Sequence, residues 1–307
     1  MSMDTIRRAH LNFGVISSTE FSTFLCSNFS MPELPEVELV ARALNGLITK
    51  RRIVAAEVLR ARLLPSSTPE EFAMQLRGAR VDSISRRGKH ILIQLDNGFV
   101  LVVHLRMSGR FLYLPLDAEL PKFTHAIFYL DNEYRLVFSD QRHFGMMKVV
   151  SADVLHEAKE LRELAPEPFS EEFTHAYLHA ALSRSRRTLK ETLLDQTKVT
   201  GLGNIYAAEA MFRARVNPFT VASEFSKRRV PKLHQAILEV LAESIAHGST
   251  LNVDPENIDG SYYGGEYEGH WRVYDREGEP CPTCQAAIKR IAHGGRSTYF
   301  CPRCQRR

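Results

Sequence analysis

The spacing of apolar residues predicts a helix over residues 36–48. Its apolar stripe consists of Val37, Val40, Leu44 and Leu47. Intervals of three and four residues place these side chains on one face of an α-helix. Pro35 suits the first helical turn, where its missing N–H costs nothing, and the basic run 50–52 follows the other end. The sequence therefore predicts one amphipathic helix before a change of pattern.

The next part of the chain consists of short β-rich runs separated by turn residues. The runs are 90–95 paired with 99–105, and 126–130 paired with 134–138. Asp96-Asn97-Gly98 separates the first pair, and Asp131-Asn132-Glu133 separates the second. Two such runs around a short turn are typical of a β-hairpin. We therefore expect residues 31–150 to form a β-rich domain that is opened by one helix.

From about residue 155 the apolar positions return to helical spacing. The predicted helical runs are 154–164, 171–183, 189–195, 205–214 and 230–246. The last run has one continuous apolar stripe, which is the usual pattern of a helix facing a core. Residues 249–270 are instead rich in Gly, Tyr, Asp and Ser, and a long loop in a compact chain is either functional or disordered. Residues 151–270 are thus expected to form a helical domain that ends in a loop.

Four of the five cysteines form two Cys-x-x-Cys pairs. They are Cys281, Cys284, Cys301 and Cys304, with 16 residues between the pairs. Each pair makes a tight turn that directs two thiolates at one ion, and four thiolates close a tetrahedral zinc site. The residues between the pairs can form a hairpin with Gly294-Gly295-Arg296 near its tip. We therefore expect residues 271–307 to be a zinc finger that is held by one structural Zn²⁺ in a reducing compartment.

Positive charge is concentrated in this last segment. Residues 271–307 contain eight Lys or Arg and three acidic residues, whereas the formal net charge of the whole chain is only +4. A basic module favours a polyanionic partner, nucleic acid before membrane. No run of 18 apolar residues occurs, which argues against a membrane-spanning helix. Residues 1–30 lack the apolar centre of a secretory signal, although their two Arg and several Ser are compatible with a transit peptide.

Several separate stretches, in a fixed order, carry a resemblance to a known family. They are MPELPEVE, RRGKHILI, HLRMSGR, SDQRHFG, LLDQTKVTGLGNIYAAEAMF and the paired Cys-x-x-Cys motif. Together they cover residues 31–307 and resemble the formamidopyrimidine-DNA glycosylase family. The resemblance implies a multidomain fold of α and β structure. Its parts are a two-sheet antiparallel β-sandwich with an opening helix, a helical helix–two-turns–helix domain and a C-terminal zinc-finger β-hairpin.

The resemblance also implies an activity. The family excises oxidised purines, such as 8-oxoguanine and formamidopyrimidines, from duplex DNA and then cuts the strand at the abasic site. Pro32 matches the nucleophile, which forms a Schiff base through an N-terminal secondary amine. Glu33 matches the acid that protonates the sugar, Lys89 the proton donor in β-elimination, and Arg296 the residue assigned to δ-elimination. Glu36 matches a further active-site carboxylate, and neither a catalytic metal nor an organic cofactor is implied.

Other matches concern DNA binding. The residues that match those filling the space of an extruded base are Met107, Arg142 and Phe144. The residues that match phosphate contacts are Arg186, Lys190 and Asn204. The loop 259–270 falls where the family has its lesion-recognition loop.

Two positions depart from the family pattern. Phe123 stands where many members have a DNA-contacting histidine, and His125 lies two residues further on. His143 replaces a common second arginine, which makes this position titratable near neutral pH.

Two alternative interpretations stay open at this point. The related endonuclease VIII type prefers oxidised pyrimidines, but MPELPEVE, RRGK and the Met-Arg-Phe set favour the oxidised-purine enzyme. The chain is instead a non-catalytic zinc-finger DNA-damage binder if residues 1–30 are retained, because an acylated proline nitrogen carries no proton and cannot form an imine. We therefore expect residues 1–30 to be disordered or absent from the working enzyme. We also expect a monomer in the bacterial cytoplasm, associated with the nucleoid and not with a membrane.

Overall fold

The structure, a computed structural model, describes residues 31–250 and 269–306. Its opening helix α2 (Leu34–Ile48) begins slightly earlier than the apolar pattern predicts. Pro35 lies in the first turn, and the backbone N–H of Glu33 donates to the carboxylate of Glu36 at 2.9 Å. This bond satisfies one of the N–H groups that a helix start leaves without a partner. The local sequence therefore both starts and caps the helix.

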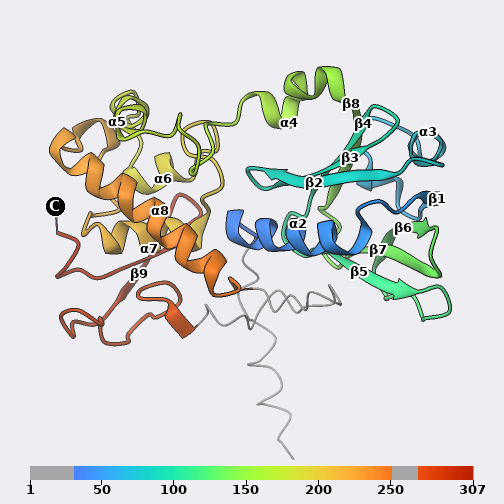
Figure 1. The fold of residues 1–307 in the computed structure, drawn as a ribbon. Coiled ribbons are helices and arrows are strands. Elements are labelled where there is room, and N and C mark those ends of the chain that lie inside the picture. The colour runs from blue at the N-terminus through green and yellow to red at the C-terminus, as the bar shows by residue number, and fades with distance from the viewer. Residues whose placement is uncertain (1–30, 251–268, 307) are drawn as a thin grey trace, which may run out of the picture.

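Two four-stranded antiparallel sheets follow α2 and form a sandwich (Figure 1). One sheet has the order β1 (Ile53–Val58), β6 (Thr124–Leu130), β7 (Tyr134–Asp140), β5 (Gly109–Pro115). The other has the order β2 (Val81–Arg87), β3 (His90–Leu95), β4 (Phe99–His104), β8 (Met146–Ser151). Both sheets share one buried apolar cluster with α2 and with helix α3 (Pro69–Leu76), which follows the short turn η2 (Ala61–Leu63). The two predicted hairpins, β3–β4 and β6–β7, are confirmed.

The chain does not enter the helical part directly after β8. The short elements η3 (Ala152–Glu157) and α4 (Lys159–Arg162) pack on the outer face of the sheet that contains β3 and β4. There Leu161 joins Leu92 and Val102 in a small apolar cluster. Alternating side chains make β3 and β4 apolar on both faces. The chain therefore reaches the helical part near residues 164–168, after these two short elements.

The helical part and the zinc finger share one core. The helices are α5 (His175–Ser183), α6 (Leu189–Leu193), α7 (Asn204–Arg213) and α8 (Val230–Ala246), with the turns η4 (Ala222–Glu224) and η5 (Lys227–Arg229). The zinc finger contains the hairpin of β9 (Lys289–His293) and β10 (Arg296–Phe300). Gly294 and Gly295 form its turn with φ values of +57° and +73°, as a two-residue hairpin turn favours. Ile288 and Tyr299 are buried in the same cluster as α7 and α8, so the finger is docked on the helical part.

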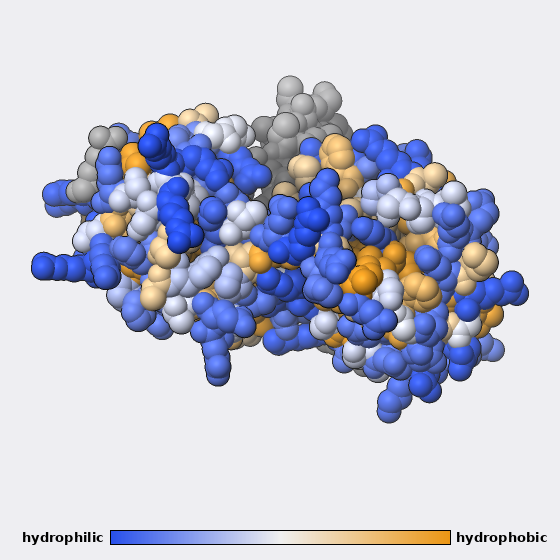
Figure 2. Space-filling model, turned by 90° about the horizontal axis from the view of Figure 1, so that it is seen from above, coloured by the Kyte–Doolittle hydropathy of each residue, from blue (hydrophilic) through white to orange (hydrophobic). Residues whose placement is uncertain are grey.

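Helix α2 connects the two halves of the molecule. Its first residue, Leu34, is buried in the core of the helical part, whereas Val40 and Leu44 are buried in the core of the sandwich. Figure 1 shows α2 running from beside α8 into the sandwich. The surface seen from the side of α4 and α5 is mostly hydrophilic, with a group of apolar residues on the sandwich side (Figure 2).

Two sequence-based expectations concern segments that the structure does not describe. The extension 1–30 lies outside the described residues, and so does nearly all of the expected lesion-recognition loop 259–270. In the described ranges, no helix is both long and apolar enough to cross a membrane.

Candidate active site

A cavity of about 680 Å³ lies where the sandwich, the helical part and the zinc finger meet. Its lining from the first half is Met31, Glu33, Lys89, His104, Arg106, Met107 and Arg142. The helical part adds Leu194, Gln196, Gly203 and Asn204, and the last segment adds Tyr274, Gly295, Arg296, Ser297 and Tyr299. Four of these residues are Lys or Arg and only one is acidic, so the cavity suits an anionic ligand.

Glu33 projects onto the start of helix α7. Its carboxylate accepts hydrogen bonds from the backbone N–H of Gly203 at 2.6 Å and from that of Ile205 at 2.8 Å. Such N–H groups have no partner within the helix and form the positive end of its dipole. Glu33 is 1% exposed, and burial raises its pKa to about 7, although Lys89 acts in the opposite direction. A carboxyl group with this pKa is partly protonated near neutral pH and can donate a proton.

Two glycines permit this close approach. A Cβ atom on Gly203 would lie 2.4 Å from Cδ of Glu33, and one on Gly201 would lie 2.5 Å from Cδ1 of Leu34. Gly201 also has a φ of +86°, which disfavours any residue with a side chain. The backbone N–H of Leu34 donates to the carbonyl of Gly201 at 3.0 Å. The Gly-Leu-Gly stretch before α7 is therefore the surface on which the start of α2 is seated.

Lys89 enters the cavity from the turn between β2 and β3. Its ammonium group donates to the carbonyl of Leu202 at 2.8 Å, and the residue is 8% exposed. Burial lowers the pKa of Lys89, Glu33 opposes this shift, and Arg296 adds to it. An acid with a raised pKa and a base with a lowered pKa thus face one cavity, which is a frequent arrangement in catalytic sites.

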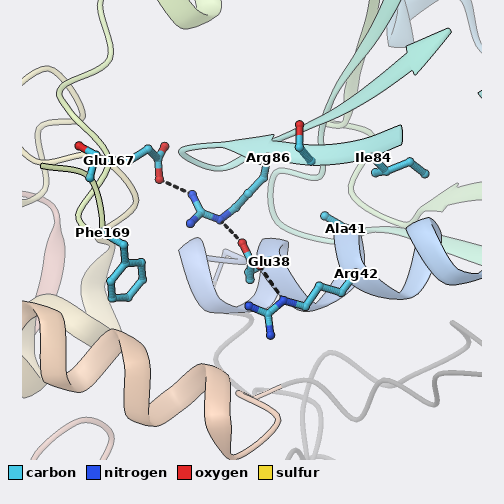
Figure 3. A pocket seen from close by; sticks show the side chains of 9 residues that line it. Glu38, Ala41, Arg42, Ile84, Arg86, Glu167 and Phe169 are labelled. Atoms are coloured by element: carbon cyan, nitrogen blue, oxygen red, sulfur yellow. Dashed lines mark hydrogen bonds and ion pairs between the residues drawn. The ribbon is translucent and has the colours of Figure 1, made fainter. Parts of the chain in front are cut away.

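The turn that carries this lysine is braced by Glu167, near which Figure 3 shows a second, smaller pocket. The Glu167 carboxylate accepts hydrogen bonds from Arg87 at 2.8 Å and from the N–H of Gly88 at 2.6 Å, and it also pairs with Arg86. Arg86 in turn donates to Glu38 of α2 at 2.7 Å (Figure 3). These bonds connect α2, the β2–β3 turn and the passage between the two halves.

Arg296 reaches the cavity from the first position of β10, directly after the glycine turn. Lys190 of α6 holds this strand in place, because its ammonium donates to the carbonyl of Ser297 at 2.6 Å and to the hydroxyl of Thr298 at 2.7 Å. Burial lowers the pKa of Lys190 to about 8, and Arg296 acts in the same direction. Lys190 is 1% exposed and does not line the cavity, so in this structure it docks the zinc finger instead of facing a ligand.

The four predicted zinc ligands lie together. The Sγ atoms of Cys281 and Cys304 are 3.9 Å apart, and those of Cys284 and Cys301 are 3.5 Å apart. A tetrahedral site with Zn–S bonds of about 2.3 Å has S–S distances of about 3.8 Å. The thiols therefore fit a structural Zn²⁺ that the protein surrounds on all four sides.

The remaining predicted residues differ in their relation to the cavity. Met107, Arg142 and Asn204 line it, whereas Phe144 and Arg186 are exposed and lie outside its lining. Asn204 is the first residue of α7, and its buried Oδ1 has no hydrogen-bond partner among the described residues. The residue thus borders the cavity while its Oδ1 has no bond to the described residues.

Pro32 and Glu36 do not belong to the lining of the cavity. Pro32 is buried directly before Glu33. The carboxylate of Glu36 accepts hydrogen bonds from the hydroxyl groups of Tyr206 at 2.6 Å and Thr250 at 2.9 Å. Glu36 is 2% exposed, so the structure places it behind Glu33 as part of a buried polar network.

Sequence reasoning missed several residues of the cavity. His104 accepts a hydrogen bond from the N–H of Arg106 at 2.9 Å, and Arg106 has a φ of +58°. Gln196 donates to the carbonyl of Leu202 at 2.8 Å and accepts from the N–H of Gly201 at 2.9 Å. For Arg106 the sequence did contain a signal, because a charged residue directly follows the apolar run 99–105. Tyr274 and Tyr299 gave no such signal, since buried tyrosines of a small domain usually belong to its core.

Three family models match the chain. The formamidopyrimidine-DNA glycosylase N-terminal domain matches residues 31–147, the formamidopyrimidine-DNA glycosylase H2TH domain matches 164–254, and the zinc finger found in FPG and IleRS matches 278–307. The three models correspond to the sandwich, the helical part and the zinc finger.

Relatives match over nearly their whole length. A formamidopyrimidine-DNA glycosylase of Pelotomaculum thermopropionicum is 42% identical over 276 residues, which cover 90% of this chain and 99% of that protein. One of Trichormus variabilis is 43% identical over 280 residues, which cover 90% of this chain and 100% of that protein. A solved complex of Lactococcus lactis Fpg with abasic-site DNA aligns at a TM-score of 0.83 and 32% identity, covering 90% of this chain and 100% of that chain.

Proposed function

The chain belongs to the formamidopyrimidine-DNA glycosylase family, a family of DNA base-excision repair enzymes, and from this premise we propose a substrate and a mechanism. It removes oxidised purines, such as 8-oxoguanine and formamidopyrimidines, from duplex DNA and cuts the strand at the resulting abasic site. The observation that carries the proposal is that Glu33, Lys89 and Arg296, three parts of the chain far apart in sequence, line one cavity.

The proposed nucleophile is the amine of Pro32 at the start of the working chain. An α-amino group has an ordinary pKa of about 7.7–8.0, so an appreciable fraction is uncharged near neutral pH. Its nitrogen attacks C1′ of the damaged nucleoside, the bond from C1′ to the base breaks, and the proton that the Pro32 nitrogen loses neutralises the departing base. Glu33 protonates O4′ as the sugar ring opens, which leaves an iminium between Pro32 and C1′. The raised pKa of Glu33, about 7, supports this role because part of the carboxyl group is protonated.

Strand cleavage then follows by elimination. The iminium draws electrons from the sugar, so that loss of a C2′ proton expels the 3′-phosphate. We assign proton transfer in this β-elimination to Lys89, which lines the cavity and whose pKa is lowered by burial. Arg296 is assigned to the following δ-elimination, in which the 5′-phosphate leaves. Every bond change is given to the chain's own groups, so the proposal invokes no catalytic metal and no organic cofactor.

Base extrusion needs a substitute in the DNA stack. Met107, Arg142 and Phe144 are proposed to fill the space that the base leaves. Asn204 and Arg186 are proposed to contact phosphates, Asn204 from the start of α7, where backbone N–H groups favour an anion. The cavity is complete in one chain, which supports action as a monomer.

A second candidate substrate is an oxidised pyrimidine. Lactococcus lactis Fpg, 33% identical to this chain, was solved in complex with DNA that contains an oxidised pyrimidine. Rates on thymine glycol and on 8-oxoguanine opposite cytosine separate the two candidates. We expect 8-oxoguanine opposite cytosine to be cut at least tenfold faster than thymine glycol. Faster cleavage of thymine glycol would instead identify the oxidised pyrimidine as the preferred substrate.

The decisive experiment concerns the start of the working chain. Protein that begins at Pro32 and protein 1–307 are each incubated with abasic DNA and borohydride, which reduces an imine to a stable cross-link. We expect the Pro32 form to be trapped and the form with an intact extension, verified by mass, not to be trapped. Equal trapping of the two intact forms rules out the proline mechanism, whereas no trapping of either favours a non-catalytic DNA-damage binder.

A further inference from the structure

Phe123 and His143, the two positions that depart from the family pattern, lie together with His125. Nε2 of His125 and Nδ1 of His143 are 2.8 Å apart. The two imidazole rings stack, with centroids 4.9 Å apart and an angle of 20° between their planes. The ring of Phe123 meets His143 edge-on at a centroid distance of 6.1 Å. None of these residues has a part in the proposed chemistry. His143 lies in the loop between β7 and β8, and the other two residues lie beside this loop.

The backbone of His143 has a φ of +60°. This left-handed region is uncommon for residues other than glycine, although Asn, Asp and His occur there more often than most, so contacts of the residue help to hold it there. Arg142 and Phe144 flank this turn and are both exposed, and the guanidinium carbon of Arg142 lies 5.9 Å from the centroid of the Phe144 ring. The conformation of His143 therefore decides how its two neighbours are presented.

The ends of the loop are anchored without the histidine. The Asp140 carboxylate accepts hydrogen bonds from the N–H of Gly145 at 2.6 Å and from that of Arg142 at 3.1 Å. It also accepts one from the hydroxyl of Ser108, the residue after Met107. One carboxylate thus connects the turn of Met107 to the loop, while the middle of the loop has, in the part of the chain that the structure describes, only a long bond from the N–H of His143 to the carbonyl of Asp140 at 3.4 Å, besides the contacts of the His143 ring.

His125 is a fixed partner for the middle of the loop. It lies in strand β6 and is 3% exposed. Its carbonyl accepts a hydrogen bond from the N–H of Leu59 at 2.8 Å. A side chain held by the sheet in this way can define the position of the more exposed ring that bonds to it.

We propose that His143 is a positioning residue for base excision, whose hydrogen bond to His125 holds Arg142 and Phe144 ready to fill the space of the extruded base. This inference rests on the proposed function of these two residues. It predicts that the contact affects removal of a base more than cleavage at a site that has already lost its base.

The contact also has an expected pH dependence. A hydrogen bond between two imidazoles needs one unprotonated nitrogen. The charged groups that face His125 are Asp140, His143 and Arg60, and Lys122 lies over the ring of Phe123. Burial lowers the pKa of His125 below its ordinary 6.5, with Asp140 opposing. His125 therefore supplies the neutral nitrogen down to a pH below 6.5, and the bond is lost only at a lower pH, where both rings are protonated.

The test compares two single-turnover rate constants of the zinc-loaded protein, one on 8-oxoguanine opposite cytosine and one on a preformed abasic site. Only the first substrate has a base to extrude, so the ratio of the rates separates this step from the chemistry. His143→Leu should lower the ratio about five- to tenfold, the effect of one lost hydrogen bond. His143→Asn should keep it within about twofold, because its amide can replace Nδ1 and tolerates a positive φ.

The pH profile supplies a readout that a merely structural role does not affect. The ratio for the unaltered protein should fall below about pH 6.5 as both rings become protonated, whereas that of His143→Asn should stay constant, because an amide has both a donor and an acceptor and can bond to His125 in either protonation state. Unchanged cleavage of the abasic site shows that each variant is folded.

A binding measurement distinguishes failure of this inference from failure of the proposed function. Duplex DNA carries 2-aminopurine opposite a tetrahydrofuran site, and its fluorescence changes when side chains enter the stack. His143→Leu should reduce this change and His143→Asn should retain it, even if the protein cuts neither substrate. The inference is overturned if the leucine variant matches the unaltered protein in both assays, or if the asparagine variant loses as much as the leucine variant.

Discussion

At the scale of single residues, a carboxyl group, an amine and a guanidinium that lie far apart in the sequence face one cavity. Glu33, Lys89 and Arg296 were selected from motifs, and all three line the cavity. The same motifs did not reveal that Glu36 and Lys190 are buried. Apart from the backbone N–H of Glu33, which donates to Glu36, their side chains bond to residues more than 100 positions away in the chain, and residue type alone cannot show such neighbours.

Gly203 offers a sharp test at this scale. A Cβ atom there would lie 2.4 Å from Cδ of Glu33, so Gly203→Ala must displace the carboxylate or the start of α7. We expect base excision to fall about 100-fold, since displacements near 1 Å have such effects. The control is Gly46→Ala in α2, where no atom lies within 4 Å. It should leave activity unchanged and stabilise the protein by about 0.5–1 kcal/mol. Equal activity of the two variants contradicts the tight seating of Glu33.

At the scale of elements, the spacing of apolar residues predicted which segments are helices or strands. It did not predict which surfaces of these elements pack against each other. The helices at 205–214 and 230–246 and the hairpins β3–β4 and β6–β7 are confirmed, because each has a clear period or turn. The run 154–164 is helical but broken, since it consists of the end of the 3₁₀ helix η3 and the four-residue α-helix α4, both on the outer face of a sheet. Its attachment could not be predicted, because β3 and β4 are apolar on both faces and periodicity does not say what covers each face.

The contact between α6 and the zinc finger gives a prediction for elements. Lys190→Met leaves the carbonyl of Ser297 and the hydroxyl of Thr298 without their donor, and should lower the free energy of unfolding by about 1–3 kcal/mol. Strand β10 carries Arg296, so the products should shift toward those of β-elimination alone. Gel analysis of the cleaved ends and urea unfolding measure the two effects. Lys227→Met, at an exposed position of η5, is the control. If Lys190→Met gives the normal products, the bonds of Lys190 to strand β10 are not needed for δ-elimination.

At the scale of the whole molecule, three sequence segments form one site across two cores. The order of a β-sandwich, a helical part and a zinc finger was predictable from the motifs and is confirmed by the fold. The contacts that connect the two halves could not be predicted from the motifs. The bonds of Glu167 to Arg86, Arg87 and Gly88 join residues about 80 positions apart in the sequence.

Glu167 provides the prediction at this scale. Burial by itself raises the pKa of Glu167, but Arg86 and the hydrogen bonds of Arg87 and Gly88 outweigh it and hold the pKa below 4.5. The stabilisation is therefore present above pH 4.5 and is lost as the pH falls through the lower pKa. Glu167→Gln should lower the free energy of unfolding by about 1–3 kcal/mol at pH 7, with a smaller difference in acid. Urea unfolding from pH 7 to pH 3 measures it.

The control for this change is Glu163→Gln, because Glu163 pairs with Arg162 at the surface and its side chain is 66% exposed. Its effect should stay within about 0.5 kcal/mol at every pH. A constant deficit of Glu167→Gln down to pH 3 shows that the carboxylate does not act through its charge.

The seating of α2 on the glycines before α7 has a consequence for synthesis of the chain. A ribosome makes Glu33 near the beginning, α7 much later and Arg296 almost last. A growing or truncated chain therefore holds the acid without the helix start that orients it, and without the arginine that completes the cavity. The full set of groups that the proposed reaction uses is therefore assembled only after the last segment has folded back on the first.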